Sequence, residues 1–200
     1  TQMAEGLGST TAAMGIVSSA LFWCYAFGQL INGRLGAYFG YKKFMMFGIF
    51  SSAVLNILIS FQSSIPVIAV LWGLNGYCQS MVWANGIGVI NNWWPKEDRG
   101  FASGVATAFS GLAQIVTYLT IMFCIVQNPE WGWRAAFRYP MLPLLIMLVV
   151  FAFVFKSKPE DIGLKPFTED DLESEAKDKD LAVEIEKRGE LYQVCIKGKD

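Results

Sequence analysis

Five long apolar stretches constrain the fold of this chain more than any other feature of its sequence. They cover about residues 11–33, 44–61, 65–93, 101–126 and 135–155. A helix needs about 20 mainly apolar residues to cross a bilayer, and the helices of a soluble bundle carry a charged face that these stretches lack. Their only charged residue is Arg138, near one end of the fifth stretch. We therefore predict an all-α integral membrane protein with five transmembrane helices.

The charged residues divide the chain into two parts. Only 16% of all residues are charged, against about a quarter in soluble domains, and all but four of the acidic residues follow residue 155. The stretch Thr168–Asp180 is too polar to bury enough apolar area to offset its chain entropy. We predict a transmembrane domain at residues 1–155 and a flexible, charged interdomain linker at 156–200, with a short helix near Asp180–Arg188.

Tightly joined helices must alternate in direction, so their connections fall on two sides of the membrane. One side carries most of the cations, namely Arg34, Lys42, Lys43, Lys96, Arg99, Lys156 and Lys158. The other side carries Arg134 and Arg138, and we expect Arg138 to extend its charged end to the interface. Cytoplasmic loops are enriched in Lys and Arg. This bias predicts a multi-pass protein of the plasma or inner membrane with its linker in the cytoplasm.

The sequence lacks the motifs that carry enzymatic chemistry. It has no histidine, its four cysteines have no metal-ligand spacing, and it contains no P-loop or nucleophile elbow. No basic run with interleaved aromatic residues suggests nucleic acid. We therefore expect no catalytic residue, no metal, no cofactor and no nucleic-acid partner, and we do not expect an enzyme.

The connection after the first stretch reads GRLGAYFGYKK, at residues 33–43. It resembles the loop signature G-x-L-x-D-R-x-G-[RK]-[RK] of the major facilitator superfamily. The glycines of this signature permit a tight turn, and its cations hold the turn at an anionic leaflet. Ala37 and Tyr38 replace the acid and the first arginine of the signature, so the charge relay that the family uses to latch its two halves is incomplete here.

Three later stretches resemble the organophosphate:phosphate antiporter branch of that superfamily, which includes glycerol-phosphate and hexose-phosphate transporters. They are residues 76–83 (GYCQSMVW), 92–100 (NWWPKEDRG) and 158–164 (KPEDIGL). The branch next carries W-N-x-x-H-N, where this chain has Ala106, Thr107, Ser110 and Gly111. The absence of the tryptophan and the histidine weakens phosphate as the substrate and leaves other organic anions and neutral solutes open. The gating and loop residues that the resemblance implies are Gly33, Arg34, Gly36, Gly40, Lys42, Lys43, Arg99 and Gly100.

The resemblance implies a helical bundle that corresponds to family helices 2 to 6, with the first helix before Thr1 and the C-terminal half after Asp200. Those two parts would be partners of this chain, together with the lipid bilayer and a small-molecule solute. It also implies a permease or antiporter that moves a small polar, anionic organic solute of the sugar-phosphate or organic-acid class by alternating access. A solute-sensing receptor on the same fold stays open, as does a membrane scaffold or enzyme without a solute path.

Neutral polar side chains within the apolar stretches are the candidates for a solute path. A charged group in mid-membrane costs several kcal/mol, and these stretches offer none there. Most of the candidates lie three or four residues apart and so share helix faces. They are Tyr25, Gln29, Asn75, Gln79, Trp83, Thr107, Ser110, Gln114 and Tyr118. Hydrogen bonding between helices, which contributes about 0.6 kcal/mol per pair, is the alternative role for these side chains.

Overall fold

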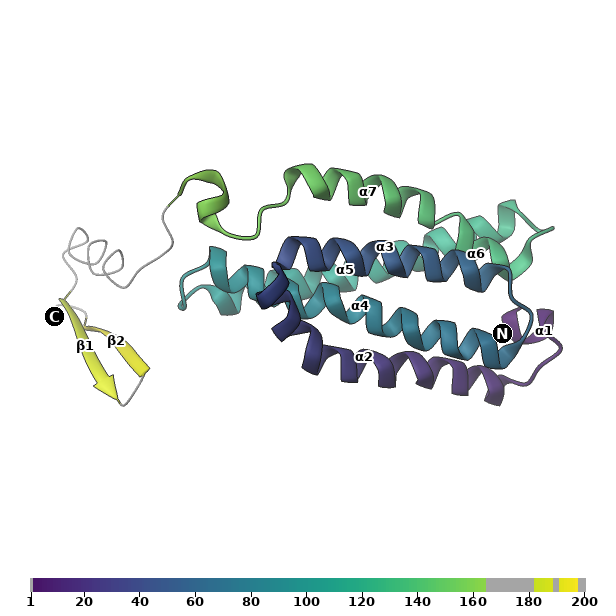
Figure 1. The fold of residues 1–200 in the computed structure, drawn as a ribbon, viewed down its shortest axis with the longest axis horizontal. Coiled ribbons are helices and arrows are strands. Elements are labelled where there is room, and N and C mark those ends of the chain that lie inside the picture. Colours follow the sequence, from purple (N-terminus) through teal and green to yellow (C-terminus); the bar gives the residue numbers. More distant parts are fainter. Residues whose placement is uncertain (1, 165–181, 189–190, 198–200) are drawn as a thin grey trace.

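Long helices run side by side in the computed structural model, which describes residues 2–164, 182–188 and 191–197 (Figure 1). The helices are α1 (Gln2–Gly6), α2 (Thr11–Phe39), α3 (Tyr41–Ser60), α4 (Ile65–Trp93), α5 (Arg99–Gln127), η1 (Gly132–Arg134), α6 (Ala135–Arg138), α7 (Met141–Val154) and η2 (Pro159–Ile162). The strands are β1 (Ala182–Arg188) and β2 (Leu191–Lys197). In the described part of the chain, five helical segments are long and apolar enough to cross a membrane, namely α2, α3, α4, α5 and the run Gly132–Val154. The predicted membrane bundle of five spans is confirmed.

Gly40 makes the turn between α2 and α3. We predicted that the first span ends near Gly33 and that a loop follows, but the helix continues to Phe39. Gly40 then leaves the helical conformation, with a φ of +94°, and α3 begins at Tyr41. Residues 34–39 contain no proline, so the helix ends only where glycine tolerates a positive φ.

Pro140 divides the fifth span. We predicted an unbroken helix over residues 135–155, but α6 ends at Arg138 and α7 starts at Met141. Proline has no N–H to donate, and its ring crowds the preceding helical turn. The fifth span is therefore a short 3-10 and α-helical segment followed by a longer α-helix.

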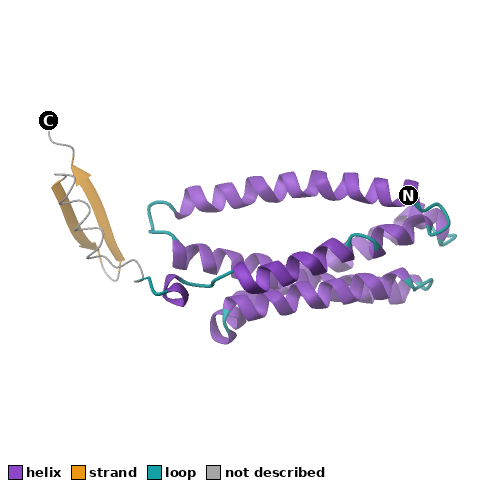
Figure 2. Ribbon diagram, turned by 90° about the horizontal axis from the view of Figure 1, so that it is seen from above, coloured by secondary structure: helices purple, strands orange, loops and turns teal. Residues whose placement is uncertain are grey.

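Contacts between distant segments show that successive helices alternate in direction along one common axis (Figure 2). At one end, here called the linker end, the Lys42 N–H donates to Ser157 Oγ at 3.1 Å and Trp93 Nε1 donates to the Lys156 carbonyl at 3.1 Å. At the opposite end, here called the far end, Arg134 Nη2 donates to Ser63 Oγ at 3.0 Å. Lys42 and Lys156, two of the cations predicted to share one side of the membrane, thus lie at the same end.

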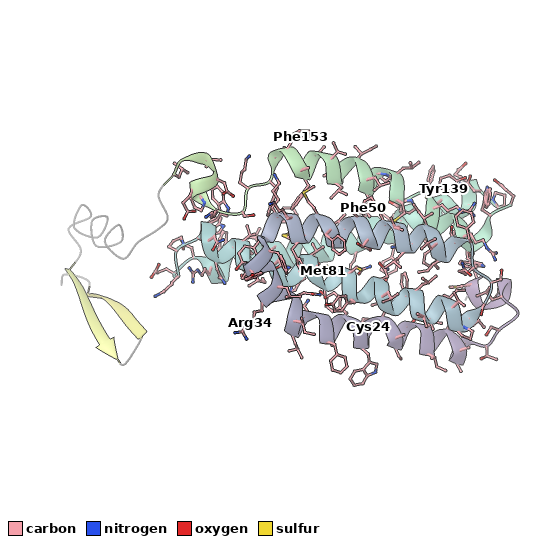
Figure 3. The ribbon with its side chains drawn as sticks, viewed as in Figure 1. Cys24, Arg34, Phe50, Met81, Tyr139 and Phe153 are labelled. Atoms are coloured by element: carbon pink, nitrogen blue, oxygen red, sulfur yellow. The ribbon has the colours of Figure 1, made fainter. Side chains whose placement is uncertain are left out.

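The helix α4 packs closely against α2 and α3 because glycines stand where the helices meet. A Cβ on Gly36 of α2 would lie 1.6 Å from Asn85 Oδ1, and a Cβ on Gly48 of α3 would lie 2.7 Å from the Cys78 carbonyl oxygen. Met81 is buried in this three-helix unit, whereas Phe153 of α7 points outward (Figure 3). The middle of α5, at residues 111–119, is exposed along its whole length.

An apolar core closes the far end of the bundle. Its buried members are Ala4, Met14, Val17, Ile59, Ile68 and Trp133. Ala4 belongs to α1, a helix that we did not predict because five residues are too few for a periodic pattern. The segment before α2 therefore covers the end of the bundle where the α3–α4 turn lies.

The first residues of the predicted linker form an ordered turn. One carboxylate oxygen of Asp161 accepts hydrogen bonds from the N–H groups of Ser157, at 3.0 Å, and Lys158, at 3.3 Å. Asp161 belongs to η2, which is capped by Gly163 with a φ of +81°. The predicted flexible stretch Thr168–Asp180 lies outside the described residues.

The strands β1 and β2 form an antiparallel pair with Ala182 opposite Lys197. The short helix that we predicted near Asp180–Arg188 is therefore wrong. Val183 and Ile185 are β-branched and alternate with charged residues, and this period of two favours a strand.

Candidate functional site

A cavity of about 350 Å³ lies between α2, α3, α4 and α7. The residues that line it are Tyr25, Gly48, Ile49, Ser52, Gln79, Val82, Trp83 and Leu144. Its polar groups are a phenol, a serine hydroxyl, an amide and an indole, and its remaining wall is apolar. Among the described residues, the lining includes no acid and no base. The cavity is open and mainly apolar, and its few polar groups can form hydrogen bonds with a neutral polar group.

Helical spacing positions the polar side chains of this cavity. Gln79 and Trp83 lie one turn apart on α4, so both reach the same space. Tyr25 comes from α2, one turn before Gln29. The cavity thus brings together Tyr25, Gln79 and Trp83, three of the residues that we predicted for a solute path. Gln29 is half-buried and does not line the cavity.

A buried hydrogen-bond network between α3 and α4 includes the cavity residue Ser52. The Ser52 hydroxyl donates to Asn75 Oδ1 at 2.6 Å, and Asn56 Nδ2 donates to the Ser52 carbonyl at 2.8 Å. Asn75 is fully buried and does not line the cavity; it holds Ser52, which does. Our sequence reasoning missed Ser52 and Asn56. Their spacing of four residues in an otherwise apolar stretch is the signal that would have revealed them.

Two further asparagines join α4 to α2. Asn32 Nδ2 donates to Ser80 Oγ at 2.7 Å and to the Tyr77 carbonyl at 3.2 Å. The Asn85 side chain hydrogen-bonds the Met81 carbonyl and fills the space beside Gly36. Among the described side chains, Asn32 Oδ1, Asn85 Oδ1 and Asn75 Nδ2 are buried without a hydrogen-bond partner. These asparagines act as contacts between helices.

The predicted polar face of α5 does not join this cavity. Thr107, Gln114 and Tyr118 are exposed and Ser110 is half-buried. The Thr107 hydroxyl donates to the Ser103 carbonyl, one turn earlier, at 2.8 Å. These four side chains share one helix face as expected, and their part in a solute path stays a prediction.

The predicted loop motif contributes mainly helix contacts and charge at the linker end. Gly33 and Gly36 lie inside α2, and Gly40 alone makes the turn. Arg34 is exposed and points away from the bundle (Figure 3), and Lys43 is also exposed. The Lys42 ammonium hydrogen-bonds the Ala152 carbonyl near the end of α7. We predicted a loop at residues 34–43, but these residues are helical except at Gly40.

The motif before α5 orders the connection from α4. Arg99 Nη2 donates to the Asn91 carbonyl at 2.8 Å, and its Nε donates to the Trp94 carbonyl at 3.1 Å. Arg99 thereby holds the end of α4 next to the start of α5. A Cβ on Gly100 would meet nothing within 4 Å, so this glycine is not needed for packing within the described chain.

Arg138 is fixed at the far end. Its guanidinium carbon lies 4.0 Å from the centre of the Trp131 ring and 4.3 Å from the centre of the Phe61 ring. Its Nε also donates to Ser60 Oγ at 2.9 Å. Arg138 therefore joins α6 to the end of α3, a role that we did not predict.

The described residues offer no group of three His, Cys, Asp or Glu side chains that could hold a metal ion. Cys24, Cys78 and Cys124 are free thiols, and Cys124 is buried.

The sequence profile of the Major Facilitator Superfamily matches residues 1–193. The chain belongs to the major facilitator superfamily. Its five membrane-spanning helices and its linker-end turn agree with that membership, and it is a multi-pass membrane protein.

Curated members of the superfamily are similar to this chain at low identity. A probable hexose phosphate transport protein of Chlamydia pneumoniae is 27% identical over 160 residues, which are 80% of this chain and 34% of the relative. A probable sulfoacetate transporter of Cupriavidus necator is 28% identical over 78% of this chain and 36% of its own length. A glycerol-3-phosphate transporter of Bacillus subtilis is 26% identical over 81% of this chain and 37% of its own length.

These superfamily relatives are named as transporters, not as enzymes. The chain spans about a third of the length of the curated relatives that it matches.

Proposed function

We propose that this chain takes part in secondary transport of a small organic anion, of the sugar-phosphate or organic-acid class, across a membrane by alternating access. In that mechanism, two halves of a transporter rock around a central site and expose it to each side in turn. The linker end would face the cytoplasm, because it carries the excess of cations. The remainder of the transporter, including a further helix and a second half, would be the partner of this bundle.

The observation that carries this proposal is that polar side chains of α2, α3 and α4 meet at one open cavity of an otherwise apolar bundle. Ser52 and Gln79 lie within helices that have no charged residue in mid-membrane, and both line the same cavity. An amide in hydrocarbon is costly unless it faces protein or water. Gln79 faces the cavity and so avoids lipid. Membership of the superfamily supports a role for this cavity in binding solute.

The cavity lining is uncharged, so we expect it to bind the neutral end of the solute and not the anionic end. A cavity without a cation cannot neutralise a phosphate, sulfonate or carboxylate group. The anionic end of the solute would therefore be bound by groups outside the described residues, and the neutral end would lie against Tyr25, Ser52, Gln79 and Trp83.

Uptake into proteoliposomes tests this proposal. The reconstituted protein should accumulate radiolabelled glycerol 3-phosphate, a hexose phosphate or sulfoacetate, and unlabelled solute should compete for uptake. Saturable binding without flux would instead favour a solute sensor on the same fold. If the protein neither bound nor transported any of the three probes, that result would contradict the proposed function.

A further inference from the structure

Two asparagines fix the direction in which the Ser52 hydroxyl points its hydrogen. Asn56 Nδ2 lies 2.8 Å from the Ser52 carbonyl oxygen. A backbone carbonyl can only accept, so the group of Asn56 that faces it must be the amide nitrogen. The same nitrogen lies 3.5 Å from Asn75 Oδ1. This long contact favours the orientation of Asn75 in which its oxygen faces Asn56 and Ser52.

The oxygen of Asn75 in turn determines what Ser52 can do. Ser52 Oγ lies 2.6 Å from Asn75 Oδ1, and an amide oxygen carries no hydrogen. Ser52 must therefore donate its single hydrogen to Asn75. The lone pairs of Ser52 Oγ remain, and these can only accept. The hydroxyl that lines the cavity is consequently an acceptor and not a donor.

We propose that Ser52 accepts a hydrogen bond from a hydroxyl group of the transported solute, so that this cavity selects the hydroxylated carbon skeleton of a sugar or polyol phosphate. The inference rests on the proposed function and extends it. A volume of about 350 Å³ falls within the range of small-molecule pockets, which is about 300–1,000 Å³. Ile49, Val82 and Leu144 provide apolar surface for the carbon atoms, and Gln79 provides a further polar group.

An acceptor at this position discriminates between solutes that are all anions. A solute hydroxyl can donate to Ser52. The oxygens of a sulfonate or carboxylate carry no hydrogen when ionised and would face the Ser52 lone pairs without a bond. Sulfoacetate has two anionic groups and no hydroxyl, so it gains nothing from Ser52. Glycerol 3-phosphate has two hydroxyls and can use it.

Substitution of Ser52 combined with removal of the solute hydroxyls tests the proposal. The reconstituted protein is assayed for uptake of glycerol 3-phosphate and for its inhibition by propyl phosphate, which has the same carbon number and no hydroxyl. Ser52→Ala should lower kcat/KM for glycerol 3-phosphate about three- to tenfold, as expected for one neutral hydrogen bond, and should leave inhibition by propyl phosphate within about twofold. Ser52→Thr, which keeps a hydroxyl, should restore much of the loss.

Ser51→Ala provides the matched control, because Ser51 is the neighbouring serine on α3 and does not line the cavity. Ser51→Ala should leave the uptake of glycerol 3-phosphate and its inhibition by propyl phosphate unchanged. The proposal would be overturned if Ser52→Ala lowered kcat/KM for glycerol 3-phosphate and weakened inhibition by propyl phosphate by the same factor. It would also be overturned if Ser52→Ala changed neither quantity. Wild-type protein that transports sulfoacetate but not glycerol 3-phosphate would also overturn it while leaving the proposed function intact. Wild-type protein that neither binds nor transports any of these probes would overturn the proposed function itself.

Discussion

The Asn32 amide nitrogen lies 2.7 Å from the hydroxyl oxygen of Ser80, and this buried hydrogen bond joins α2 to α4 near the middle of the bundle. Ser80 in turn donates to the Tyr77 carbonyl at 2.7 Å. The Ser80 hydroxyl thus accepts a hydrogen bond from α2 and donates one within α4. A Cβ on Gly28 would lie 2.1 Å from Ser80 Oγ, so the glycine allows this approach. Close packing and hydrogen bonding therefore coincide at one point of contact.

Substitution of the two partners should give unequal losses of stability. Asn32→Ala removes two hydrogen bonds and leaves a void, so the free energy of unfolding should fall by about 1–3 kcal/mol. Ser80→Ala leaves the bond from Asn32 to the Tyr77 carbonyl in place, so its loss should be about 0.5–1.5 kcal/mol. Denaturant unfolding of the purified protein in detergent measures both. A larger loss for Ser80→Ala would contradict this account of the contact.

Substitution of two glycines of the loop motif by alanine should have different effects on the stability of the protein. A Cβ on Gly36 would lie 1.6 Å from Asn85 Oδ1, so Gly36→Ala forces Asn85 out of its place and should destabilise the protein by about 1–3 kcal/mol. A Cβ on Gly33 would have its nearest neighbour at 3.7 Å, an ordinary contact.

Gly33→Ala is therefore the matched control for Gly36→Ala. Alanine favours a helix over glycine by about 1 kcal/mol, so Gly33→Ala should be neutral or stabilising. Thermal unfolding followed by tryptophan fluorescence separates the two variants. If both midpoints fell equally, the close approach of α2 and α4 at Gly36 would not be the cause.

Arg138 should not tolerate lysine. The flat guanidinium contacts the Phe61 and Trp131 rings and also donates from Nε to Ser60, and an ammonium group cannot do both. Arg138→Lys should lower the free energy of unfolding by about 1–2 kcal/mol. Arg34→Lys, at an exposed position, should change it by less than about 0.5 kcal/mol. Equal effects of the two substitutions would argue that Arg138 is held only by its charge.

Asp161 should protect the start of the linker from proteolysis. Its carboxylate accepts from the N–H groups of Ser157 and Lys158, so Asp161→Ala should open this turn and speed tryptic cleavage of the Lys156–Ser157 bond several-fold. Glu160→Ala removes the neighbouring, exposed carboxylate and should leave the cleavage rate unchanged. Mass spectrometry of timed digests identifies the cleavage site. Equal rates in the two variants would contradict the role of Asp161.

The long spans were predictable because lipid imposes a simple rule on the backbone and on charge. Each span needs about 20 mainly apolar residues, and all five helical segments meet this requirement. The turn at Gly40 was not predictable from the cations around it, because Arg34 extends from helix as readily as from a loop. The strand β1 was missed since a charged stretch hid the alternation of Val183 and Ile185.

The site was predictable only in part, for a related physical reason. Gln79 and Trp83 share a face of one helix, and the 3.6-residue period finds such pairs. Ser52 reaches the cavity because α3 lies against α4 at Gly48, and a single helix period carries no information on which helices meet. The same limit applies to Asn75, whose partner Ser52 lies on another helix.

Accessibility of a cysteine at position 79 tests the central claim that the cavity belongs to the solute path. Gln79→Cys, in a protein whose native cysteines are replaced by alanine, is treated in proteoliposomes with a water-soluble thiol reagent, with and without glycerol 3-phosphate. Our account predicts that the cysteine reacts and that the solute slows the reaction several-fold. A cysteine that is inert to the reagent, or that reacts at the same rate with and without solute, would contradict it.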